Sequence, residues 1–159
     1  MNNHSVLKSP FGDIGIRTNS IGIYMILLPS TKKILDMDNP INKYSPIMEQ
    51  ARRELSQYFS GERKSFTIPI DLKITLFYKK VLLEVFRIPF GETRSYQQIA
   101  KYTGNIKATR AVGSANAKNP IPIIIPCHRI IASNGMSGGY SGGLEMKKRL
   151  LYHESFCNK

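Results

Sequence analysis

A cysteine and a histidine stand side by side at positions 127 and 128, within an apolar stretch bounded by prolines. This stretch, residues 121–131, predicts a short, buried, extended segment that carries both side chains into the interior. A thiol beside a base can become a nucleophilic thiolate, but a buried cysteine next to a core histidine can equally be simple packing. Neighbouring side chains point in different directions, so a Cys127–His128 hydrogen bond needs a bent backbone or a bridging water. The pair alone leaves both interpretations open.

Two features that follow the pair in the sequence could take part in the same chemistry. Glu154 is a candidate partner for His128, because a carboxylate on the far ring nitrogen fixes the tautomer and raises the basicity of the imidazole. Residues 138–143 place glycines around Tyr140 and Ser141, which predicts either a loop whose backbone approaches a ligand or a mobile connector. This loop lacks the lysine and the spacing of a phosphate-binding loop.

Metal and cofactor chemistry is not expected. Two cysteines and three histidines exclude the cysteine-rich zinc sites, so we predict no metal and no cofactor. Two cysteines also do not make a disulfide framework, which favours a reducing, cytoplasmic setting. No apolar stretch has the length of a membrane span, and the N-terminus lacks a signal-peptide pattern, so we expect no membrane partner.

The chain has a net charge of +12, and the surplus is concentrated in its second half. Residues 85–159 hold 11 Lys and Arg against 3 Asp and Glu. Between Gly91 and Gly135 the only acidic residue is Glu92. Such a surplus favours nucleic acid as the partner, although a basic protein without one can have the same composition.

The first half of the chain predicts a small α+β scaffold. Residues 11–28 alternate as a β-hairpin with Ile14 and Ile16 on one face, and residues 29–45 are loop-like. Ser45 is placed to cap a helix that ends at Gly61. Residues 66–72 are expected to be extended and to lead out of the scaffold.

The second half predicts mostly helices. One helix is expected over about residues 75–87, and the last over about residues 144–154, with Lys147 on its solvent side. The inward side chains of the first helix are expected to be Phe77, Val81, Val85 and Phe86. The fold class is therefore α+β: a scaffold domain over residues 1–72 and a mostly helical domain over residues 73–159.

Two short helices between residues 95 and 117 predict a helix-turn-helix. Ser95 and Gln98 form a capping box for the first, which should run to about residue 102, and the second should span about 107–117. The second helix is built almost entirely of small residues, including Ala111 and Gly113, with Arg110 standing out. Such a surface can lie close against a groove while one long cation reaches inward, or it can pack tightly against a neighbouring helix.

Five motifs occur in one order along the second half. They are Ser95-Tyr96-Gln97-Gln98-Ile99-Ala100, Arg110-Ala111-Val112-Gly113, Asn119-Pro120, Ile125-Pro126-Cys127-His128-Arg129-Ile130 and Tyr140-Ser141-Gly142-Gly143. Together they resemble the O6-alkylguanine-DNA alkyltransferases, also called methylated-DNA–protein-cysteine methyltransferases. The strong resemblance covers about residues 75–154, and residues 55–61 extend it more weakly into the first half. The Cys-His motif together with the other blocks is highly specific, whereas the helix-turn-helix alone is not.

The resemblance implies a suicidal DNA-repair enzyme. It would bind duplex DNA that carries O6-alkylguanine, flip the damaged base out through the minor groove, and transfer a methyl or other alkyl group irreversibly to Cys127. Each molecule would act once, as a monomer. O4-alkylthymine is a possible second substrate.

The resemblance also implies roles for single residues. Cys127 would take the alkyl group, His128 would deprotonate it through a water, and Glu154 would orient His128. Asn119 would brace the active-site turn, and Tyr96 would assist flipping and protonate the departing guanine.

The remaining implied roles concern binding. Arg110 would fill the space that the flipped base leaves, and Tyr140 and Ser141 would line the base pocket. The DNA-contacting set is Arg110, Ala111, Gly113, Ser95 and Gln97. Asn116 and Ser137 are polar where some relatives have apolar neighbours of the pocket, which leaves the acceptance of bulky alkyl groups open.

Two other functions compete with this one. A DNA-binding module without catalysis would explain the basic surplus but has no use for a reactive thiol. A Cys-His hydrolase would use the thiol but explains neither the helix-turn-helix nor the charge.

Overall fold

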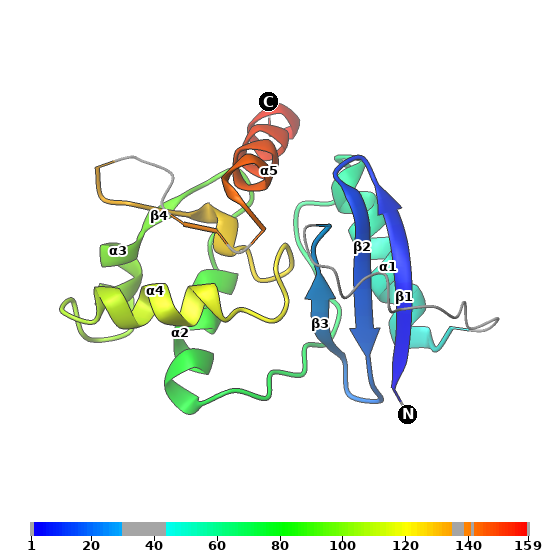
Figure 1. Cartoon of the computed structure of the whole chain (residues 1–159), viewed down its shortest axis with the longest axis horizontal. Helices are drawn as coiled ribbons and strands as arrows, with labels where there is room; N and C mark the ends of the chain where they lie inside the picture. The colour runs from blue at the N-terminus through cyan, green and yellow to red at the C-terminus, as the bar shows by residue number, and fades with distance from the viewer. Residues whose placement is uncertain (1, 30–43, 135–138, 141, 159) are drawn as a thin grey trace. The chain divides into compact units, whose positions relative to one another are not determined.

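The structure is a computed structural model that describes residues 2–29, 44–134, 139–140 and 142–158. The chain divides into two compact units, Met1–Lys73 and Ile74–Lys159. Within the described residues, the first unit is a three-stranded sheet with one helix, and the second is mostly helical (Figure 1). This α+β architecture confirms the predicted fold class.

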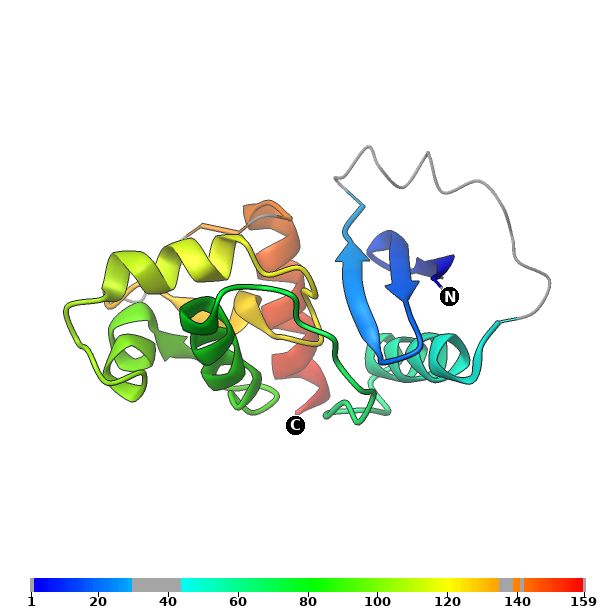
Figure 2. The same cartoon turned by 90° about the horizontal axis from the view of Figure 1, so that it is seen from below.

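The sheet of the first unit is antiparallel with the strand order β1-β2-β3. Its strands are β1 (Asn3–Ser9), β2 (Gly12–Thr18) and β3 (Ile23–Leu27). The helix α1 (Pro46–Phe59) lies along one face of the sheet (Figure 2). Ser45 Oγ accepts a hydrogen bond from Met48 N at 3.2 Å, so the predicted cap is confirmed.

The buried faces of these elements form the core of the first unit. Ile14 and Ile16 point into it from β2, and α1 contributes Met48, Leu55 and Tyr58. The expected extended segment after α1 meets β3 through a parallel bridge between Ile70 and Ile23.

The second unit has four helices within the described residues: α2 (Leu76–Phe86), α3 (Tyr96–Tyr102), α4 (Thr109–Ala117) and α5 (Leu144–Cys157). The short strands β4 (Arg94–Ser95) and β5 (Ile130–Ile131) pair in parallel. The prediction for Phe77 is wrong, because its side chain is 39% exposed and Leu82 is buried instead. Both are apolar positions on α2, where several exposed hydrophobic residues obscure which face is buried.

The helices α3 and α4 are joined by a tight turn at Gly104, whose φ of +96° suits glycine. The capping box at the start of α3 is confirmed: Ser95 Oγ accepts from Gln98 N, and Gln98 Oε1 accepts from Ser95 N. The helix α4 begins at Thr109, two residues later than expected.

The stretch 121–131 is buried as predicted, but it is not an extended segment. Ile123 has a φ of +75°, a rare conformation for a β-branched residue, and it reverses the chain. Residues Cys127–Arg129 then form one turn of 3₁₀-helix, designated η2, before β5. The prolines and the apolar pattern predicted burial correctly, but they carry no signal for these two turns.

Candidate active site

The turn η2 (Cys127–Arg129) places a thiol, an imidazole and a guanidinium in the interior. Cys127 is 1% exposed, and His128 is fully buried. The turn is closed by hydrogen bonds from Cys127 N to Ile125 O at 2.8 Å and from Arg129 N to Pro126 O at 2.9 Å. In one turn of 3₁₀-helix the three side chains leave the backbone in three different directions, whereas a strand would point the first and the third to the same face.

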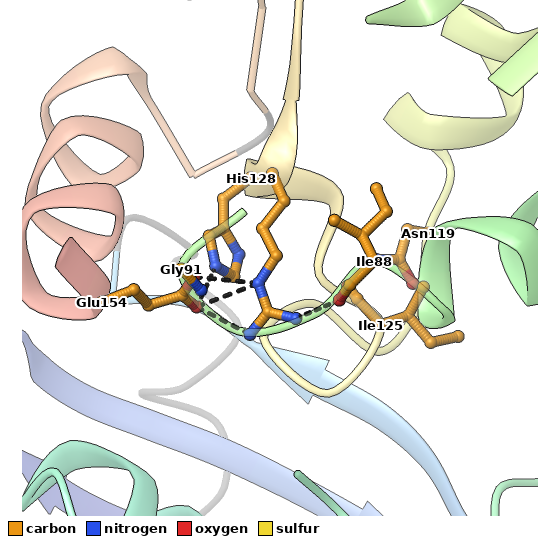
Figure 3. Close-up of polar contacts among 7 residues, drawn as sticks. Ile88, Gly91, Asn119, Ile125, His128 and Glu154 are labelled. Atoms are coloured by element: carbon orange, nitrogen blue, oxygen red, sulfur yellow. Dashed lines mark hydrogen bonds and ion pairs between the residues drawn. The ribbon is translucent and has the colours of Figure 1, made fainter. Parts of the chain in front are cut away.

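His128 contacts Glu154, which α5 carries into the same interior (Figure 3). The distance from His128 Nε2 to Glu154 Oε1 is 2.7 Å. Burial alone would raise the pKa of Glu154, but the hydrogen bonds and charges of His128 and Arg129 outweigh it and hold that pKa well below its usual range. The carboxylate is therefore ionised and can only accept hydrogen bonds.

The hydrogen bond to Glu154 fixes the tautomer of His128. Burial lowers the pKa of His128 below its usual value, although Glu154 opposes this, so the ring is neutral at pH 7. Because Glu154 only accepts, Nε2 carries the proton and Nδ1 carries the lone pair. Nδ1 is buried and has no hydrogen-bond partner in the described part of the chain. It is a base whose accepting atom is unoccupied.

Arg129 completes the contacts of Glu154. Its Nε lies 2.9 Å from Oε2, its Nη2 lies 2.8 Å from Oε1, and its Nη1 donates to Ile88 O at 2.6 Å. Gly91 N also donates to Oε2, at 3.2 Å. Figure 3 shows Glu154, His128, Gly91 and Ile88 gathered in this cluster. Each nitrogen of the Arg129 guanidinium and both oxygens of Glu154 thus have hydrogen-bond partners, which offsets part of the cost of removing both charges from water.

Asn119 braces the turn that precedes the cysteine. Its Nδ2 donates to Ile125 O at 2.9 Å, and its Oδ1 accepts from Ile121 N at 3.0 Å. One side chain therefore ties both ends of the reversal at Ile123. This gives Asn119 a definite structural task directly before Cys127.

Burial raises the pKa of the Cys127 thiol to about 11, while a hydrogen bond from Asn119 and the charge of Lys147 oppose this shift. The thiol is therefore protonated in the resting protein. Its neighbour His128 does not bond to it directly, because Nδ1 has no partner among the described residues.

The prediction that Lys147 faces solvent is wrong. Lys147 is fully buried, and its Nζ donates to Ile130 O at 2.6 Å and to Gly139 O at 3.3 Å. The helix α5 has charged residues on several sides, so its sequence does not show which of them turns inward. Backbone carbonyls of β5 and of the glycine-rich loop hold the ammonium group, and its charge acts on Cys127.

A cavity of about 290 Å³ opens between α3, α4 and the glycine-rich loop. Its lining residues are Tyr96, Gly113, Asn116, Ala117, Gly139 and Tyr140. The Tyr140 hydroxyl is buried without a partner among the described residues. Burial raises the pKa of Tyr96, and its interaction with Cys127 raises it further. Cys127 does not itself line this cavity, but it interacts with both tyrosines at its wall.

The structure places the expected DNA-contacting residues on or beside α3 and α4. Arg110 and Gln97 are exposed, whereas Ala111, Gly113 and Ser95 are half-buried. A Cβ added at Gly113 would meet Tyr96 Cε1 at 3.9 Å, an ordinary contact, so packing inside the protein does not require glycine there. Ser141 lies outside the described residues, so the structure does not place it.

Three side chains of the site escaped the sequence analysis: Arg129 and Lys147, whose roles depend on distant carbonyls and carboxylates, and Asn116, noted only as a polar departure. The sequence showed Arg129 only as one residue of the Ile125–Ile130 motif.

In the described residues, no group of three His, Cys, Asp or Glu is arranged to hold a metal ion. Nor does any described helix have the length and apolar character needed to cross a membrane.

Family models match both units of the chain. A model of the 6-O-methylguanine DNA methyltransferase DNA-binding domain matches residues 76–156, and a model of its ribonuclease-like domain matches residues 3–72. The methylated-DNA–protein-cysteine methyltransferase of Methanosarcina acetivorans is 40% identical over 154 residues, which cover 97% of this chain and 99% of that protein. The chain belongs to the methylated-DNA–protein-cysteine methyltransferase family.

Other members of the methyltransferase family agree with this assignment. The constitutive enzyme of Bacillus subtilis is 39% identical over all of this chain and 99% of its own. The crystal structure of the Mycobacterium tuberculosis O6-methylguanine methyltransferase has a TM-score of 0.85 at 35% identity, covering 98% of this chain and 94% of that one. The structure of M. tuberculosis OGT in complex with DNA has a TM-score of 0.84 at 34% identity, covering 97% and 93%. The predicted family and enzyme class are confirmed.

Proposed function

We propose that the protein repairs duplex DNA by moving the methyl group of O6-methylguanine to Cys127, once per molecule and irreversibly. Larger O6-alkyl groups and O4-alkylthymine belong to the same substrate class. Family membership supports the reaction, and the DNA complex of a structural relative supports the partner. The single observation that carries the proposal is the lone pair of His128 Nδ1, buried next to a cysteine while Nε2 is anchored on Glu154.

The first step is activation of the thiol. With a pKa of about 11, only about one Cys127 in ten thousand is ionised at pH 7, so attack needs a base. Because no direct bond joins Sγ to Nδ1, a bridging water carries the proton to His128. The ionised Glu154 stabilises the imidazolium that forms, and the Lys147 ammonium stabilises the thiolate.

The second step is transfer. The Cys127 sulfur attacks the methyl carbon, a C–S bond forms, and the bond from that carbon to guanine O6 breaks with its electron pair left on the base. Tyr96 donates a proton to the ring of the departing guanine. Its raised pKa keeps the hydroxyl protonated until that moment. The product is a thioether, which water does not readily cleave, so the protein is spent after one transfer.

Access to the thiol requires that the base leave the duplex. Arg110 extends from the exposed side of α4 and takes the position that the base vacates. The small residues Ala111 and Gly113 allow the helix to approach the minor groove closely. Tyr140 and Ser141 form the walls around the flipped base, and Ser95 and Gln97 contact the flanking backbone.

Intact-mass spectrometry tests the proposal. The protein is incubated with an excess of an oligonucleotide that contains O6-methylguanine, and the modified peptide is then mapped. We expect one methyl group per molecule, located on Cys127. Cys127→Ala should bind the duplex but take up no methyl group, whereas the matched control Cys157→Ala should react like the unmodified protein. Removal of many equivalents of methyl group by one equivalent of protein would contradict the proposal.

A further inference from the structure

Asn116 carries a buried acceptor atom that the fold leaves without a partner. The side chain is on α4 and is 6% exposed. Its Nδ2 donates to Cys127 O at 3.4 Å. A carbonyl oxygen only accepts, so this contact fixes which end of the amide faces Cys127. Oδ1 must therefore point elsewhere, and it is buried with no hydrogen-bond partner in the described residues.

Asn116 lines the cavity of about 290 Å³ together with Tyr96 and Tyr140. This volume is at the lower end of the range for small-molecule sites and suits a single planar base. The Tyr140 hydroxyl, on the same cavity, is likewise buried without a partner among the described residues. Polar groups without partners are uncommon in native interiors, and here two of them belong to residues that line one cavity.

Oδ1 can only accept, so a ligand that satisfies it must bring a hydrogen-bond donor. On the edge of O6-alkylguanine that bears the reacting oxygen, the hydrogen-bond donor is the exocyclic 2-amino group. The ring nitrogen between them loses its proton when O6 is alkylated and cannot donate. O6-alkylhypoxanthine differs from the guanine lesion only by the absence of this amino group, and O4-alkylthymine also lacks it.

We propose that Asn116 Oδ1 accepts a hydrogen bond from the 2-amino group of the flipped base, and that Asn116 is thereby a specificity-determining residue that favours guanine lesions. This inference rests on the proposed function, because it places a flipped base in the cavity. Sites built to hydrogen-bond an N–H discriminate strongly against an analogue that lacks it, since the polar atom is then left unpaired.

The test is a competition between two oligonucleotides of the same sequence, one with O6-methylguanine and one with O6-methylhypoxanthine, mixed with a limiting amount of protein. Both lesions draw on the same folded molecules, so the ratio of products is independent of any loss of folded protein. We expect the unmodified protein to prefer guanine about tenfold, which corresponds to about 1.4 kcal/mol.

The variant Asn116→Leu keeps the approximate shape of the side chain and removes the acceptor, and Asn116→Ala removes the acceptor and leaves space. Both should bring the ratio close to one, through slower reaction of guanine. Ser114→Ala is the matched control, because Ser114 is on the same helix and contacts the Tyr78 hydroxyl at 2.9 Å. It should keep the tenfold preference.

A preference that stays near tenfold in both Asn116 variants would overturn the inference, as would a ratio near one in the unmodified protein. Neither result would affect the proposed function, because methyl groups would still reach Cys127. If the unmodified protein took no methyl group from either oligonucleotide, the proposed function itself would fail.

Discussion

His128 and Cys127 are neighbours in the sequence, yet the tautomer of His128 is set by Glu154, 26 positions away. Glu154 holds Nε2 at 2.7 Å and leaves Nδ1 as the only atom of the ring that can take a proton. Burial raises the pKa of Cys127 to about 11 and lowers that of His128 below its usual value. In the resting protein both groups are therefore neutral.

These two opposite shifts predict a flat pH profile for methyl transfer. Thiol and imidazole together share one titratable proton. The fraction of molecules in this protonation state is constant between the lowered pKa of His128 and about pH 11. Single-turnover rates should therefore be nearly constant from pH 7 to pH 9. They should fall only when the pH drops below the usual histidine range, because Nδ1 then becomes protonated.

The control for this profile is His128→Gln, which removes the base. Its rate should be low and should rise about tenfold per pH unit over the same interval, because only spontaneous ionisation of the thiol remains. If the unmodified protein showed that rise as well, His128 would not be the proton acceptor. Quenched single-turnover assays with methylated DNA measure both profiles.

Among single residues, the sequence indicated the thiol, its base and the carboxylate, but it missed the two buried cations. Cys127 and His128 are chemically distinctive, and Glu154 was a candidate partner for the histidine that the family resemblance then supported. Lys147 and Arg129 escaped because backbone carbonyls such as Ile130 O and Ile88 O hold them, and the sequence does not show where such acceptors lie. A buried lysine is also rare, so periodicity favours the wrong side of α5.

Among the elements, α4 is the one whose composition its own packing does not explain. Gly113 has room for a methyl group, since the added Cβ would lie 3.9 Å from Tyr96. Gly113→Ala should therefore stabilise the free protein by about 0.5–1 kcal/mol through helix propensity. It should at the same time weaken binding to duplex DNA, because Gly113 is half-buried on the helix proposed to approach the groove, where an added group reduces the room for the DNA.

Thermal unfolding and fluorescence anisotropy with a labelled duplex measure these two effects separately. Ser114→Ala, the neighbouring position that faces Tyr78, serves as control and should leave DNA affinity unchanged. Equal DNA affinity for Gly113→Ala and the unmodified protein would place the groove-facing surface elsewhere.

Capping and periodicity predicted the helices well, because Ser45 and Ser95 are strong local signals. The strand β1 was missed because its buried face includes the polar residues Asn3 and Ser5, which break the expected alternation. The reversal at Ile123 was missed for the opposite reason. A β-branched residue is the last that sequence rules would place at a positive φ.

For the molecule as a whole, the dominant quantity is the net charge of +12. Binding to undamaged duplex DNA should depend steeply on salt, since each neutralised phosphate releases counterions. With only two such contacts, the affinity should already fall about tenfold between 50 and 200 mM salt. Lys101→Ala and Lys107→Ala, both at exposed positions near the helix-turn-helix, should each lower the salt slope by about one.

Lys8→Ala is the matched control for the salt experiment, because Lys8 is also exposed but belongs to the first unit. Its slope should equal that of the unmodified protein. An unchanged slope in both helix-turn-helix variants would mean that other cations contact the phosphates.

Glu154 holds the imidazole of His128, the guanidinium of Arg129 and the backbone of Gly91 with one carboxylate. A substitution that adjusts the basicity of the imidazole through this group also loosens the turn after α2 and the packing of the last helix. A substitution of Glu154 that raised the rate of methyl transfer would therefore lower the stability of the fold. Laboratory evolution toward faster repair should accumulate its gains in the walls of the cavity and keep the glutamate unchanged.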